Sequence, residues 1–235
     1  MGSSNNYYTA VVPFLTEQGY RCITFDMTGS GLSSYTCVEQ SIHSLAEDVI
    51  ALMDVLSIDK AVFVGHSMSG IVGPEVAAEW PDRIQGLILV GPVWPTSDVT
   101  PVFEDRINKV ADKGMEAMAD TVPYAAVGSK ANSLHHAFIR ELLLGMEPAG
   151  YISLCRVIAN AHKSPPKYGK VSCPTLIIAG EEDKSAPVAG CEKIIGALGS
   201  GQKDMVVMSK CGHWHCIEDP TEVGKLSVEF LKQIS

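Results

Sequence analysis

The chain has 235 residues, of which 46% are hydrophobic and 19% are charged. This length and composition predict one domain with its own core and exclude a disordered chain. The net charge of −9 argues against nucleic acid or an anionic membrane surface as a partner, because both attract basic patches, and no apolar run approaches the roughly 20 residues that cross a bilayer.

Short apolar runs alternate with longer amphipathic ones along most of the chain. The expected strands are 21–25, 61–64, 86–90, 175–179 and 205–208. Helices are expected over 41–56, which has apolar residues at helical spacing, after Ser67 as far as Pro81, and from about Pro220 to the end. This alternation predicts an α/β fold with a mostly parallel sheet and helices on both of its faces.

The alternation stops between residues 95 and 170. Apolar stripes at helical spacing follow one another there, over 103–118, 138–146 and 147–161, and a Pro-Pro pair then returns the chain to a strand. We therefore expect a core built from 1–94 and 171–235, with 95–170 as a helical lid inserted over one end of the sheet.

The stretch 62–70 carries the strongest functional signal. A β-rich run ends in Gly65-His66-Ser67, and a helical pattern begins at once. A nucleophile elbow requires this setting, because its tight strand-to-helix turn exposes the serine oxygen at the top of the sheet. The new helix also directs free N–H groups toward developing negative charge. Ser67 is therefore the candidate nucleophile, the alternative being a turn with an incidental serine.

On these residues the chain resembles the α/β-hydrolase superfamily, and the resemblance covers essentially the whole sequence. Residues 19–33 are similar to the fourth strand of that family and its glycine-rich loop, and 81–91 to a helix end and the sixth strand. The family has glycine two residues after the nucleophile, where this chain has Ser69 and then Gly70. Because serine is nearly as small, we expect it to be tolerated. The resemblance implies the α/β-hydrolase fold with a helical lid.

The family order of nucleophile, acid and histidine selects the remaining catalytic candidates. Asp183 stands in a loop after the strand 175–179, four residues before Pro187, as the family acid does. It would fix the tautomer of the base and stabilise the imidazolium. Its neighbours Glu181 and Glu182 are the alternative acids, although solvated loop charges are the simpler interpretation.

The base is expected in the segment 211–220. Its Gly-His pair, followed by a helix that an Asp-Pro pair opens, matches the family loop and selects His213. His215 is the alternative base. This segment also places two cysteines and two histidines within six residues, Cys211, His213, His215 and Cys216, but structural zinc sites draw on two ligand pairs that a longer loop separates. We expect neither a metal nor a cofactor.

These candidates imply acyl transfer with two backbone N–H groups holding the oxyanion. The elbow supplies one donor, at Met68. A serine at position 67 disfavours the dehalogenase and epoxide-hydrolase branches, which use a carboxylate nucleophile. The family takes the second donor from the loop after its third strand, which corresponds here to the first residues of the chain. Either Gly2 or Ser3 would supply it, or the second donor is absent.

The first residues also raise an expectation about the sheet. The resembling sheet has eight strands, and this sequence starts after the third. We therefore expect that the front of the protein is missing from it, with a naturally shortened fold as the alternative. That third strand lies between the fourth and fifth. Without it, 21–25 and 61–64 either pair directly or leave a gap.

Within the superfamily, 146–159 and 170–177 are similar to the 3-oxoadipate enol-lactonase group. A small carboxylic ester or lactone is therefore the expected substrate. A thioesterase, a carbon–carbon bond hydrolase and a non-catalytic receptor or degenerate hydrolase are the alternatives. Trp94 and Trp214 are the candidate substrate-binding residues; weaker candidates are Phe103, Tyr124, Met146 and Tyr151, with Arg140 or Arg156 for a substrate carboxylate.

Cysteine usage bears on the compartment. The seven cysteines are odd in number and mostly far apart, there is no N-x-S/T acceptor, and the first eight residues are polar. This pattern favours a reducing compartment without a secretory signal. We therefore expect a cytoplasmic protein, and its oligomeric state stays open.

Overall fold

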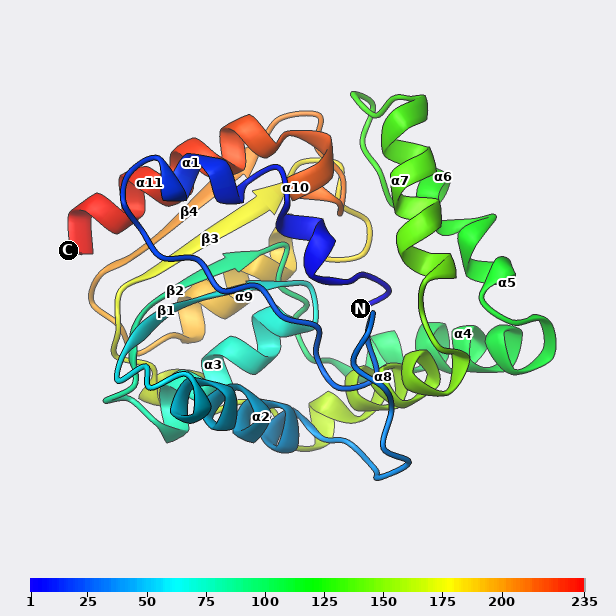
Figure 1. Ribbon diagram of the computed structural model, residues 1–235, viewed down its shortest axis with the longest axis horizontal. Coiled ribbons are helices and arrows are strands. Elements are labelled where there is room, and N and C mark those ends of the chain that lie inside the picture. Colours follow the sequence, from blue (N-terminus) through cyan, green and yellow to red (C-terminus); the bar gives the residue numbers. More distant parts are fainter. Residues whose placement is uncertain (235) are drawn as a thin grey trace.

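Four parallel strands form the sheet in the computed structural model, which describes residues 1–234 (Figure 1). They are β1 (Ala61–His66), β2 (Ile84–Val90), β3 (Thr175–Gly180) and β4 (Lys203–Met208). Their order in the sheet, β1-β2-β3-β4, follows the order of the chain. The two central strands are almost wholly buried, as their continuous apolar sequences predict for strands covered on both faces. The sheet is parallel throughout, as the alternation of apolar runs and helical patterns predicts.

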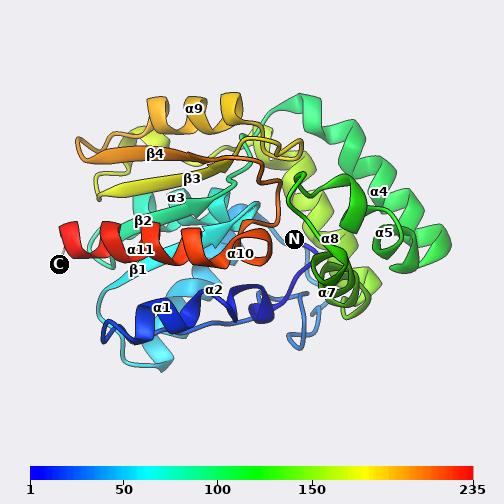
Figure 2. The same ribbon diagram turned by 90° about the horizontal axis from the view of Figure 1, so that it is seen from above.

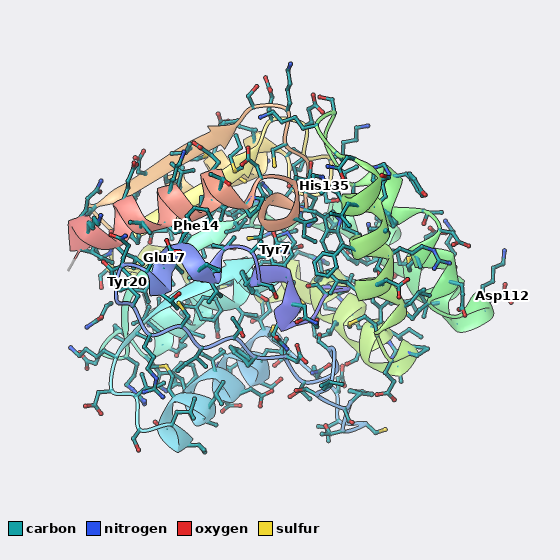
Figure 3. The ribbon with its side chains drawn as sticks, turned by 45° about the horizontal axis from the view of Figure 1, so that its top comes forward. Tyr7, Phe14, Glu17, Tyr20, Asp112 and His135 are labelled. Carbon is teal, nitrogen blue, oxygen red and sulfur yellow. The ribbon has the colours of Figure 1, made fainter. Side chains whose placement is uncertain are left out.

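Helices cover both faces of this sheet. Figure 1 shows α1 and α11 on one side of it and α2 and α3 on the other. Phe14 of α1 packs against α11 at Gly224, where an added Cβ would lie 2.5 Å from the phenyl ring (Figure 3). The helices of this core are η1 (Asn5–Tyr8), α1 (Val12–Thr16), α2 (Ile42–Val55), α3 (Ser69–Glu79), α9 (Val188–Ala197), α10 (His215–Glu218) and α11 (Pro220–Ile234).

The predicted strand at 21–25 is wrong. These residues are extended, but they pair with no strand, and Ile23 is 40% exposed. A groove of about 650 Å³ separates them from β1, the edge strand, and α2 and α11 contribute to its apolar lining. A strand needs a neighbour at about 4.8 Å to complete its hydrogen bonds. The chain therefore leaves a gap here instead of pairing the two segments directly.

The chain between β2 and β3 is helical. Its elements are η2 (Ser97–Val99), α4 (Thr100–Lys113), α5 (Glu116–Ala119), α6 (Val122–Ala125), α7 (Ser133–Leu144), α8 (Pro148–Asn160), η3 (Ala161–Lys163) and η4 (Tyr168–Lys170). The stripe expected over 103–118 is divided at Gly114, whose φ of +71° suits glycine and ends α4. Figure 2 shows these helices beyond the carboxyl ends of the strands. This is the end of a parallel sheet where ligands bind in α/β folds.

No single helix within residues 1–234 is long and apolar enough to cross a bilayer. The pair Ser133–Leu144 and Pro148–Lys163 passes the same test by length and composition, with a bend of 99° between its members.

Candidate active site

Ser67 stands at the sharp turn between β1 and α3. Its φ of +55° is a left-handed conformation that costs a non-glycine residue about 1 kcal/mol or more. Small neighbours make the turn possible: a Cβ on Gly65 would lie 2.5 Å from the Ser69 carbonyl oxygen, and one on Gly70 would lie 2.7 Å from Pro92. Ser69, where the family has glycine, is accommodated, and its hydroxyl lies 3.2 Å from the Met27 sulfur.

The structure brings the three predicted catalytic side chains into one hydrogen-bonded chain. His213 Nδ1 lies 2.8 Å from Asp183 Oδ2, and His213 Nε2 lies 2.9 Å from Ser67 Oγ. Because the carboxylate only accepts, Nδ1 carries the imidazole proton, and Nε2 is left to accept the serine proton. All three residues are buried. The arrangement has the geometry of a nucleophile, a general base and an orienting acid.

The carboxyl group of Asp183 is well held at its position after β3. Its Oδ1 accepts hydrogen bonds from the backbone N–H groups of Ser185 and Ala186, both at 2.8 Å. Burial by itself raises the pKa of Asp183, but the attraction and hydrogen bond of His213 outweigh it and hold the pKa below its usual value. Asp183 is thus kept as the carboxylate that an imidazolium needs beside it.

The alternative acids point elsewhere. Glu181 accepts hydrogen bonds from Ser209 and from the Lys210 N–H, and Glu182 accepts from Ser129. Neither has a hydrogen bond to His213 among the described residues. Both carboxylates join surface loops to one another, which agrees with their interpretation as solvated loop charges.

His215, the alternative base, and His66 both serve the backbone of His213. The Nδ1–H of His215 and the Nε2–H of His66 donate to the His213 carbonyl oxygen, at 3.0 and 2.7 Å. The Nε2 atom of His215 is buried without a hydrogen-bond partner. Burial lowers the pKa of His215 to about 4 and that of His66 well below its usual value. Both rings are therefore neutral at pH 7, which suits supporting groups better than a proton acceptor near neutral pH.

Stability is expected to fall as the pH is lowered from about 6.5 to about 4. Over this range the unfolded chain protonates His215, whereas the folded protein does not, because its pKa there is about 4. A difference of this size corresponds to about 3 kcal/mol of the free energy of unfolding. His66 shifts in the same direction. Urea denaturation at a series of pH values measures the effect.

His215→Asn isolates the contribution of this ring, because the asparagine amide keeps a donor near the Nδ1 position but does not titrate. We expect a shallower loss of stability with falling pH in this variant. His43→Asn is the matched control, since the His43 side chain is 52% exposed. Equal slopes in the His215→Asn variant and the wild type would contradict the assignment.

Aromatic rings close the back of the site. Tyr7 of η1 stacks on His66 with a centroid separation of 4.3 Å, and its hydroxyl accepts from the Cys216 N–H of α10 (Figure 3). Trp214 is 2% exposed and meets Tyr7 edge-on at 6.0 Å. Sequence reasoning missed Tyr7, because no local pattern links residue 7 to residue 66. Trp94 stacks on Tyr168 at 5.4 Å, and a substrate-binding role for either tryptophan stays a prediction.

The two predicted oxyanion donors come close together. Met68 and Ser3 both line a cavity of about 50 Å³ that also borders His66 and Ser69. Met68 lies immediately before α3, where the N–H groups of a helix start are free of intrahelical partners. Their role as donors stays a prediction.

The other binding candidates lie in different settings. Tyr151, Met146 and Phe103 are buried, whereas Tyr124 is 65% exposed. Arg140 pairs with Asp120 and Glu141 at the surface, and Arg156 is exposed. The four residues considered for zinc are divided among separate partners, and no group of three metal-binding side chains occurs within residues 1–234.

Comparison with known proteins gives consistent matches. Residues 1–148 match a family model described as alpha/beta hydrolase fold. The chain is 28% identical over 244 residues to 2-hydroxy-6-oxo-6-phenylhexa-2,4-dienoate hydrolase of Comamonas testosteroni, covering 99% of this chain and 84% of that protein. It is 30% identical over 203 residues to 3-oxoadipate enol-lactonase 2 of Acinetobacter baylyi, covering 83% and 74%. The crystal structure of the enol-lactonase from Burkholderia xenovorans LB400 matches with a TM-score of 0.85 and 26% identity, over 98% of this chain and 88% of that one.

Proposed function

The chain belongs to the α/β-hydrolase fold family, and from this membership we propose that it is a serine hydrolase that cleaves a small carboxylic ester or lactone through an acyl-enzyme on Ser67. The observation that carries the proposal is the continuous hydrogen-bonded chain from Asp183 through His213 to the Ser67 hydroxyl, at 2.8 and 2.9 Å. The relatives that support an ester or lactone substrate are the two enol-lactonases.

The proposed reaction proceeds in two halves. His213 Nε2 takes the Ser67 proton as Oγ attacks the substrate carbonyl carbon, and Asp183 stabilises the imidazolium that results. The Met68 N–H, with Ser3 as the second donor, would hold the oxyanion. The imidazolium then protonates the leaving oxygen, which leaves an ester on Ser67. Water, deprotonated by His213, attacks that ester and releases the acid.

The helices between β2 and β3 belong to this proposal as the lid, residues 95–170. They lie beyond the carboxyl ends of the strands (Figure 2). Along the chain, Ser67, Asp183 and His213 follow the carboxyl ends of β1, β3 and β4. A lid in this position would shape the pocket for the substrate and limit access of water. The cytoplasmic location expected from the cysteine pattern is also part of the proposal.

Carbon–carbon bond hydrolysis is the second candidate. The observation in its favour is the match to the Comamonas testosteroni dienoate hydrolase, which extends over 99% of this chain. The same serine, base and acid would serve, with a ketone carbonyl in place of an ester carbonyl as the electrophile.

A substrate panel tests the proposal and separates the two candidates. Purified protein is assayed with p-nitrophenyl acetate and butyrate, with small lactones, and with a 6-oxo-hexa-2,4-dienoate. We expect the largest kcat/KM in this panel to belong to an ester or a lactone. A larger value for the dienoate would instead establish the second candidate. The hydrolase proposal would be wrong if no substrate is turned over and a fluorophosphonate probe fails to label Ser67 in the folded protein. This outcome would favour a non-catalytic receptor.

A further inference from the structure

Glu218, at the end of α10, is a buried acid that the proposed reaction does not use. Glu218 is only 7% exposed, and within residues 1–234 its carboxylate forms no ion pair with a lysine, arginine or histidine. A buried carboxylate without such partners is costly unless hydrogen bonds satisfy it. The groups that satisfy Glu218 therefore indicate what its charge holds in place.

Two of these groups flank the base. Glu218 Oε2 accepts from the Gly212 N–H at 2.9 Å, and Oε1 accepts from the Trp214 N–H at 2.9 Å. Gly212 and Trp214 are the residues immediately before and after His213. One carboxylate thus holds the backbone on both sides of the imidazole, with charge-assisted hydrogen bonds that are stronger than neutral ones.

The third group comes from the helical region between β2 and β3. Oε2 also accepts from the Gly128 N–H at 2.7 Å. Gly128 belongs to residues 126–129, the first part of the connection from α6 to α7, which we call the strap. The strap contributes another bond, since its Ala126 carbonyl accepts from the His213 N–H at 2.8 Å.

The strap and the His213 loop also touch through their backbones. A Cβ on Gly128 would lie 2.7 Å from the Gly212 nitrogen, and a Cβ on Gly212 would meet the backbone of Val127 and Gly128. Only glycine fits at both positions. The Glu218 carboxylate lies at this junction, bonded to each side.

We propose that Glu218 is the positioning residue for the catalytic base, and that it does so by fastening the His213 loop to the strap of the lid. This inference rests on the proposed role of His213. Three N–H groups on two segments converge on one carboxylate, so the imidazole is aimed at Ser67 and Asp183 only when the strap is docked. Sequence reasoning gave no role to Glu218, which stands five residues after His213 in an acidic pair with Asp219.

Glu218→Gln tests this with little change of shape. The amide nitrogen donates and cannot accept, so at least one of the three N–H groups loses its partner. We expect kcat for the best ester or lactone to fall about 10- to 100-fold, because small misplacements of a catalytic group have effects of this order, with KM little changed. Glu182→Gln is the matched control, since the Glu182 carboxylate binds the strap at Ser129 and not the His213 loop, and the substitution leaves the backbone hydrogen bond from the Glu182 N–H to the Cys211 carbonyl oxygen in place.

A second measurement does not depend on turnover. The Nδ1 proton that His213 shares with Asp183 is expected to give a far-downfield proton NMR resonance in the wild type and in Glu182→Gln. In Glu218→Gln this resonance should disappear or broaden, while thermal unfolding and circular dichroism show a folded protein. Glu218→Ala, which removes both acceptor oxygens and so all three hydrogen bonds, should lose it as well.

The outcomes of these measurements separate the positioning role of Glu218 from the proposed hydrolase function. If Glu218→Gln retains both the wild-type kcat and the His213 resonance, Glu218 is not a positioning residue. If the wild type hydrolyses nothing, the proposed function fails, and the resonance alone decides whether Glu218 holds the imidazole. Equal losses in Glu218→Gln and Glu182→Gln would also overturn the inference, because they would mean that only the strap matters.

Discussion

Ser67→Ala is expected to abolish hydrolysis, with kcat falling by about 10⁴-fold or more. The side chain of Ser67 is the only hydroxyl hydrogen-bonded to His213 Nε2 among the described residues, at 2.9 Å. Without it, no acyl-enzyme forms, and the remaining rate comes from whatever binding and oxyanion stabilisation the site offers to attack by water. Stopped assays of kcat, with fluorophosphonate labelling followed by mass spectrometry, measure the loss.

The fold should survive this change. Alanine is smaller than serine, and the only bond lost is the one to His213, although the strained φ of +55° remains. Ser69→Ala is the matched control, because Ser69 is two residues away and its hydroxyl contacts the Met27 sulfur instead of the base. We expect near wild-type kcat from the control. A Ser67→Ala protein that hydrolyses as fast as the wild type would show that the nucleophile lies elsewhere.

Asp183→Asn is the second change with a large expected effect, a fall in kcat of about 10⁴-fold. An asparagine amide that turned its nitrogen toward His213 would donate, and the imidazole would then have to accept at Nδ1. The proton would lie on Nε2, so His213 could no longer accept the Ser67 proton. An amide that turned its oxygen instead would keep the tautomer but lose the charge that stabilises the imidazolium. Steady-state kinetics with the best substrate measure this change.

Glu181→Gln and Glu182→Gln are the controls for Asp183, since both belong to the same loop and were its competitors on sequence grounds. Their carboxylates bind Ser209, Lys210 and Ser129. We expect kcat within a few fold of the wild type for each. A loss in either control that matches Asp183→Asn would reassign the acid.

Features that depend on short, local patterns could be predicted from the sequence. The strands β1, β2 and β3 are short continuous apolar runs that alternate with helical patterns, which is typical of a parallel sheet covered by helices. The elbow at Ser67 is a local event between a strand and a helix. The positions of Asp183 and His213 came from the family order, and the hydrogen bonds between them agree with it.

Features that depend on distant partners could not be predicted in this way. Residues 21–25 have the composition of a strand, yet whether they form one depends on whether another strand lies beside them, and here a groove does. The helix α9 has few buried residues to mark it. The roles of Tyr7 and Glu218 depend on partners that are distant in the sequence. Tyr7 stacks on His66, and Glu218 accepts a hydrogen bond from the Gly128 N–H.

The order of the strands bears on how proteins of this fold diversify. Ser67 follows β1, the helical region follows β2, Asp183 follows β3, and His213 follows β4. Each therefore leaves the same edge of the sheet from its own strand, and the lengths of the segments between strands are free to change without moving the strand ends. Under the proposed function, substrate choice can drift in the helical region outside the strap, residues 126–129, while the proton-transfer geometry that the strap supports is kept. Relatives whose names describe a carbon–carbon bond hydrolase and an enol-lactonase are what such independence would produce.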